Sequence, residues 1–149
     1  MKEIVFEARD TAAEIFAGDK HLKELTDIID LSVRLSENGG RDLDNIHRIG
    51  EGWGAEETLG IAIYCSLRHQ NDFSAGVIAA VNHKGDSDSA GVVTGNILGA
   101  LLGYGRIDEK WKPIWNSQTS SWKWRTTCVM DDKCMNTAIM RIRLGLESI

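Results

Sequence analysis

The chain has 149 residues, a size that fits one domain, and its 42% hydrophobic and 26% charged residues are ordinary for a soluble globular protein. Its net charge of −5, with no Lys/Arg-rich face in the first hundred residues, argues against a nucleic-acid partner. The uncharged run at 90–104 is too short and too glycine-rich to span a membrane, and the N-terminus lacks the apolar core of a signal peptide, so we expect a cytoplasmic protein without a membrane partner.

The first half of the chain has helical patterns. Apolar residues recur at helical spacing over 4–16 and again over 22–33, and the second run is followed by the stop signal Asn38-Gly39-Gly40. These two segments are predicted to be amphipathic surface helices. A short turn is expected at 44–48, before the glycine-rich loop at 50–54.

Three further helices are expected after this loop. Glu56 and Glu57 occupy the first turn of the first of them, which continues to Leu67. Asn71-Asp72 ends this helix and caps the next one, whose apolar positions lie within 73–81. The uncharged run at 90–104 forms the third. With one proline, Pro113, and no alternating strand pattern, the sequence predicts an all-α domain.

Glycines recur every four residues in the uncharged run, at Gly91, Gly95, Gly99 and Gly103. Residues four apart fall on nearly the same face of a helix. The sequence therefore predicts a smooth strip on a buried helix, against which a neighbouring helix can lie unusually close.

The segment at 82–89, hereafter the acidic segment, places Asp86, Asp88 and Ser89 just before this helix. Carboxylate and hydroxyl oxygens are the ligands that Mg²⁺ and Ca²⁺ prefer. Helix capping explains one acidic residue here but not two together with Ser89. A calcium-binding EF-hand is set aside, because Ala90 and Ile97 occupy positions where that loop needs ligands.

Cysteine and histidine patterns exclude two other kinds of site. The three cysteines, Cys65, Cys128 and Cys134, form no C-x-x-C pair, and the four histidines form no H-E-x-x-H motif. Neither a disulfide scaffold nor a zinc site is expected. Cys65 lies in an apolar helical pattern and is predicted to be a core residue.

Three segments together resemble the C-terminal half of an ADP-ribosylglycohydrolase: GEGWGAEETLGIAIYC at 50–65, NHKGDSDS at 82–89 and TGNILGA at 94–100. This family also includes dinitrogenase reductase activating glycohydrolase. The resemblance runs from near residue 1 to about Trp111.

The resemblance implies an all-helical enzyme of the orthogonal ADP-ribosylglycohydrolase type with two Mg²⁺ ions. Such an enzyme hydrolyses the bond between the distal ribose of ADP-ribose and an acceptor, so its partner would be an ADP-ribosylated protein or a small ADP-ribose conjugate. The implied metal ligands are Asp86, Asp88 and Ser89. Trp53 would flank the nucleotide pocket, the alternative being a core position. No further catalytic residue is assigned.

The chain also departs from the family pattern. It lacks the early Thr-Asp-Asp-Thr motif that completes the metal site, and its only adjacent aspartates, Asp131-Asp132, follow Met130. We therefore expect 1–112 to be the C-terminal part of such a domain, an incomplete half-domain. The tail at 113–149, rich in tryptophan, is expected to be non-family sequence produced by a frameshift near Pro113, which resequencing of the coding DNA tests.

Alternatives to an active enzyme follow from the missing motif. One is a catalytically inactive ADP-ribose-binding or structural module with the same fold, and another is a truncated product without function. The acidic residues Glu51, Glu56 and Glu57 are interpreted as structural, because acids in a first helical turn usually interact with the helix dipole. His83, next to the candidate ligands in the acidic segment, is expected to be a structural histidine.

Overall fold

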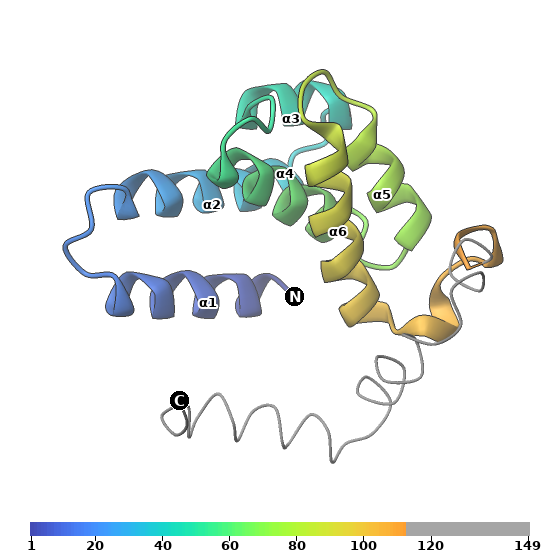
Figure 1. Ribbon diagram of the computed structural model, residues 1–149, viewed down its shortest axis with the longest axis horizontal. Coiled ribbons are helices and arrows are strands. Elements are labelled where there is room, and N and C mark those ends of the chain that lie inside the picture. Colours follow the sequence, from blue (N-terminus) through green and yellow to red (C-terminus); the bar gives the residue numbers. More distant parts are fainter. Residues whose placement is uncertain (113–149) are drawn as a thin grey trace, which may run out of the picture. The chain divides into compact units, whose positions relative to one another are not determined.

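The computed structural model describes residues 1–112, and within them the chain is helical with no strand. Six α-helices follow one another, and two short 3₁₀ turns come after them (Figure 1). Their bounds are α1 (Lys2–Ile15), α2 (Leu22–Ser36), α3 (Asp42–Ile49), α4 (Ala55–Arg68), α5 (Phe73–Val81), α6 (Ser87–Leu102), η1 (Tyr104–Arg106) and η2 (Glu109–Trp111). The all-α prediction is confirmed for this part of the chain.

Residues 1–108 form one compact unit, and a second unit begins at Glu109. Within the first unit, α5 and α6 run across the direction of α1 and α2 (Figure 1). Helix α1 has no buried residue and packs along α2, as expected for a surface helix. No helix in the described residues is long and apolar enough to cross a membrane.

Helix α4 lies at the centre of this unit, because every residue from Gly60 to Ser66 is buried and it contacts α2, α3, α5 and α6. A helix that is apolar on all sides is stable only when other helices cover it. Its central residues join a core cluster from five helices: Leu35, Ile46, Ile49, Ile61, Tyr64, Cys65, Ala80 and Ala90. The predicted core position of Cys65 is confirmed, and burial raises the pKa of its thiol.

The glycine strip of α6 faces α5, and the two helices lie side by side (Figure 1). A Cβ added at Gly91 would lie 2.4 Å from Val81 Cγ1, whereas one at Gly95 would lie 3.9 Å from Val77 Cγ2. A Cβ at Gly99 would lie 3.9 Å from Phe73 Cε2. The predicted strip is therefore confirmed as the surface that meets α5, but only Gly91 requires the absence of a side chain.

Two expectations about this helix were wrong. Gly103 is not part of the strip: α6 ends at Leu102, and Gly103 turns the chain with φ of 74°. That left-handed conformation suits glycine and ends the helix. Nor is α6 buried along all its surface, since Val92 is 64% exposed.

The short turn expected at 44–48 is an eight-residue helix, α3. Eight residues are too few to reveal a helical period in sequence. Charged residues at both ends favour the helix, with Asp42 and Asp44 in the first turn and Arg48 in the last. It buries Ile46 and Ile49 against the core.

Candidate functional site at the start of helix α6

The acidic segment and the glycine-rich loop at 50–54 lie against each other. The backbone N–H of Asp86 donates to the Glu51 carbonyl oxygen at 2.9 Å. Gly85 makes this approach possible, because it has φ of 110° and a Cβ there would lie 2.0 Å from the same carbonyl oxygen. On the other side of the contact, a Cβ at Gly52 would lie 3.2 Å from the Asp86 carbonyl oxygen. The two motifs quoted in the sequence analysis therefore form one structural element.

Two side chains in the first turn of α4 form hydrogen bonds with the glycine-rich loop. Glu57 Oε2 accepts a hydrogen bond from the Gly52 backbone N–H at 3.0 Å. The buried Thr58 hydroxyl donates to the Gly52 carbonyl oxygen at 2.8 Å. Both peptide groups of Gly52 are thus fixed by side chains. The sequence analysis interpreted Glu57 only as a residue that interacts with the helix dipole. Glu57 lies three residues after Gly54, which caps α4, and an acid at this position commonly accepts a hydrogen bond from the backbone that precedes the helix.

The three predicted metal ligands lie together at the start of α6. Asp86 is the residue that precedes the helix, whereas Asp88 and Ser89 lie inside its first turn rather than in a loop before it. Asp86 and Ser89 are half-buried and Asp88 is exposed. A hydrogen bond with the Asp86 carboxyl group lowers the pKa of Asp88, and the Ser89 backbone N–H, which donates to Asp88 Oδ1 at 2.9 Å, lowers it further. The two carboxyl groups therefore face each other.

This arrangement fits a divalent cation. Two bare carboxylates in contact repel each other, so a proton or a cation must lie between them. Among residues 1–112, neither Asp86 nor Asp88 forms an ion pair with a lysine or arginine. Hard oxygen ligands of this kind are those that Mg²⁺ prefers. However, no group of three or more His, Cys, Asp or Glu side chains in the described residues could hold a metal. Metal binding by Asp86, Asp88 and Ser89 stays a prediction, and it requires further ligands beyond these three residues.

Trp53 projects from the glycine-rich loop and is 71% exposed. Its indole N–H donates to Glu51 Oε2 at 3.2 Å. This exposure excludes the alternative in which Trp53 fills a core position. An exposed indole on the loop that contacts the acidic segment is free to meet a ligand, and its role in substrate binding stays a prediction.

His83 adds a second ring, within the acidic segment itself. Its Nδ1 lies 2.7 Å from the Lys84 carbonyl oxygen, whereas its buried Nε2 has no hydrogen-bond partner within residues 1–112. The ring lines a cavity of about 340 Å³ together with side chains of α3, among them Leu43 and His47. The expected structural hydrogen bond is therefore present on one ring nitrogen only.

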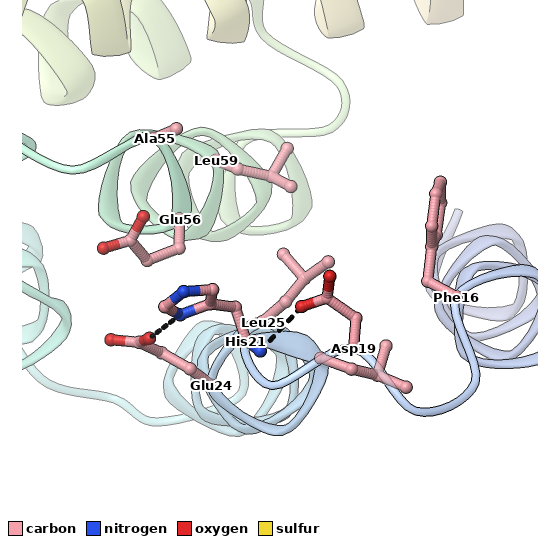
Figure 2. Close-up of a pocket in the computed structure, with 9 residues that line it drawn as sticks. Phe16, Asp19, His21, Glu24, Leu25, Ala55, Glu56 and Leu59 are labelled. Carbon is pink, nitrogen blue, oxygen red and sulfur yellow. Dashed lines mark hydrogen bonds and ion pairs between the residues drawn. The ribbon is translucent and has the colours of Figure 1, made fainter.

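A separate cavity of about 550 Å³ lies where the end of α1, the start of α2 and the start of α4 meet (Figure 2). In it, the backbone N–H of His21 donates to Asp19 Oδ1 at 2.7 Å, and the imidazole Nδ1 lies 3.5 Å from Glu24 Oε2. The lining residues are Phe16, Asp19, His21, Leu22, Glu24, Leu25, Ala55, Glu56 and Leu59. None of them belongs to the acidic segment, so this cavity is not the site predicted from sequence.

A polar cluster missed in the sequence joins α3 to α4. Asp42 accepts a hydrogen bond from the Tyr64 hydroxyl at 2.6 Å and lies 2.9 Å from His69 Nε2. Burial alone would raise the pKa of Asp42, but the hydrogen bonds from Tyr64 and His69 and the charge of Arg68 outweigh it and lower this pKa. Arg68 also donates to backbone carbonyl oxygens of the segment between α2 and α3. The cluster holds these helices together and is structural.

Comparison with known proteins gives one family. The family described as ADP-ribosylglycohydrolase matches residues 1–130 of the chain. No curated protein and no solved structure matches the chain. The matched range includes part of the tail at 113–149. This tail lies outside the described residues. The boundary at 112 and the frameshift therefore both stay predictions.

Proposed function

The chain belongs to the ADP-ribosylglycohydrolase family, and from this premise we propose that it contributes to Mg²⁺-dependent hydrolysis of an ADP-ribosyl glycosidic bond. The substrate class is an ADP-ribosylated protein or a small ADP-ribose conjugate. In this proposal Asp86, Asp88 and Ser89 are ligands of Mg²⁺, of which a complete site holds two ions.

The placement of Asp86, Asp88 and Ser89 together at the start of α6 supports this proposal. These residues stand on a segment that is fixed by backbone contacts, since Asp86 N–H bonds the Glu51 carbonyl oxygen at 2.9 Å and Gly91 allows α6 to press against Val81. Metal ligands must keep their positions within a few tenths of an ångström. A surface pair of acids on a mobile loop would not meet that requirement.

Bound Mg²⁺ would orient the ribose hydroxyls and stabilise developing negative charge during attack by water at the anomeric carbon. The protein's own contribution is to hold the oxygens of Asp86, Asp88 and Ser89 at one place. Trp53, exposed beside this place, offers a flat apolar face on which an adenine or ribose ring can stack. Because no group of three or more His, Cys, Asp or Glu side chains in residues 1–112 could hold a metal, this proposal requires further ligands from other residues.

Release of ADP-ribose tests this function. The chain, and a longer version extended upstream in its reading frame, would each be incubated with an ADP-ribosylated peptide, with Mg²⁺ or with a chelator. We expect Mg²⁺-dependent release by at least the longer protein and its loss in Asp88→Asn. Asp27→Asn, which changes an exposed carboxylate on α2, should keep the activity.

Release that is equal with and without Mg²⁺, or unchanged in Asp88→Asn, would contradict the proposal. ADP-ribose binding without any release in the longer protein would favour the inactive binding module instead.

A further inference from the structure

On the basis of the function proposed above, we propose that Glu57 is a positioning residue for the acidic segment. Its carboxylate fixes the glycine-rich loop, and the Glu51 carbonyl oxygen of that loop fixes the backbone of Asp86. Glu57 would thus set the affinity for Mg²⁺ without contacting the ion.

The first link joins α4 to the loop. Gly52 has φ of 82°, a conformation that glycine adopts readily but also leaves readily, so the loop needs external restraints. Glu57 Oε2 supplies one by accepting the Gly52 N–H at 3.0 Å. A Cβ at Gly50 would lie 2.5 Å from the carboxyl carbon of Glu57, so this carboxylate packs against the backbone at the start of the loop.

The second link joins the loop to the acidic segment. The Glu51 carbonyl oxygen, in the residue just before Gly52, accepts the Asp86 N–H at 2.9 Å. A displacement of Gly52 therefore moves the acceptor that orients Asp86. Residues that orient metal ligands through hydrogen bonds typically change metal affinity by 10- to 100-fold when they are removed.

Glu56 provides a matched control. It lies beside Glu57 in the first turn of α4 and interacts with the same helix dipole, but it lines the cavity of Figure 2. Its carboxylate lies against Gly54, at the end of the glycine-rich loop, but in the described part of the chain it makes no hydrogen bond to Gly52. A difference between Glu57→Ala and Glu56→Ala therefore reports the hydrogen bond to the Gly52 N–H, and not the loss of an acid near a helix terminus or beside the loop.

The experiment is a Mg²⁺ titration of the 149-residue chain at constant ionic strength, followed by NMR at the backbone amides of Asp88 and Ser89. We expect saturable shifts in the wild type, an apparent Kd about tenfold weaker in Glu57→Ala, and less than a twofold change in Glu56→Ala. Glu57→Gln keeps an acceptor for the Gly52 N–H and should recover most of the affinity. Circular dichroism establishes that each variant is folded at the titration temperature.

The outcomes separate the two proposals. If the wild type shows no saturable shift, either as the 149-residue chain or in the version extended upstream, the metal site itself is wrong. If the wild type binds and Glu57→Ala binds equally well, or Glu56→Ala is weakened as much, the positioning role is wrong. Should Glu57→Ala not fold, Glu57→Asp replaces it, because it keeps the charge but withdraws the carboxylate by one methylene. Unchanged affinity in Glu57→Asp would then overturn the positioning role.

Discussion

Helix α6 offers a matched pair of substitutions that tests how closely it packs on α5. Replacing Gly91 or Gly95 by alanine adds the same methyl group to the same helix. Each change should gain about 1 kcal/mol, since alanine is the better helix former. The helix-propensity gain is therefore nearly common to both variants and cancels in their difference.

The contacts at the two positions differ. The new methyl carbon at 91 would lie 2.4 Å from Val81 Cγ1, whereas carbon atoms normally stay about 3.5–4.0 Å apart. Val81 is β-branched and has few rotamers with which to move aside. Overpacking of this kind costs about 1–3 kcal/mol. At 95 the new methyl carbon would lie 3.9 Å from Val77 Cγ2, an ordinary contact that costs nothing.

We therefore expect Gly95→Ala to raise the free energy of unfolding by about 1 kcal/mol. The free energy of unfolding of Gly91→Ala should be about 1–3 kcal/mol lower than that of Gly95→Ala. Urea unfolding without Mg²⁺ measures both values by linear extrapolation. In the Gly91→Ala background, Val81→Ala should remove most of the deficit, which a double-mutant cycle isolates. Equal stabilisation by the two glycine substitutions would refute the close approach at Gly91.

Two further substitutions test the interior. Asp42→Asn should lower the free energy of unfolding by about 2 kcal/mol at pH 7, because it removes the charge that accepts the Tyr64 hydroxyl. Since the pKa of Asp42 is lowered in the folded protein, its contribution is present above the ordinary pKa and is lost as the pH falls through the lowered one. Wild type and variant should thus converge as the pH falls below the ordinary carboxyl pKa of 3.8 in urea unfolding, and a constant gap would contradict this. Thr94→Val should raise the free energy of unfolding by about 1 kcal/mol, because the fully buried Thr94 hydroxyl has no hydrogen-bond partner in the described residues; a lower midpoint in thermal melting would be the opposite result.

Local patterns predicted much of the fold. Apolar spacing and stop signals indicated α1, α2, α4 and α5, and the side chain of Asp72 does cap α5 by accepting the Ala75 N–H at 2.9 Å. The four-residue spacing of glycines located the face of α6 that meets α5. Helix α3 was missed, because its stability comes from burial of Ile46 and Ile49 and from contacts with α4 that are distant in sequence.

The site was predicted only as a set of residue types. Sequence indicated that Asp86 and Asp88 could share a cation; both lie at the start of α6, and cation binding itself stays a prediction. The contact between the glycine-rich loop and the acidic segment could not be predicted, because it joins the main-chain atoms of Glu51 and Asp86, and main-chain atoms are the same in every residue. The only sign of this contact in the sequence of the acidic segment is the glycine at position 85, which has a positive φ in the structure. A glycine does not indicate which residue approaches it.

Binding of Mn²⁺ as a paramagnetic probe tests the metal site most directly. Mn²⁺ accepts the same oxygen ligands as Mg²⁺ and broadens the NMR signals of nearby amides. At substoichiometric Mn²⁺ we expect the amides of 86–89 and of the adjoining Glu51 and Gly52 to broaden first, and Mg²⁺ to restore them by competition. Broadening that begins at acids elsewhere on the surface, or that persists unchanged in Asp86→Asn/Asp88→Asn, would contradict a metal site at the start of α6.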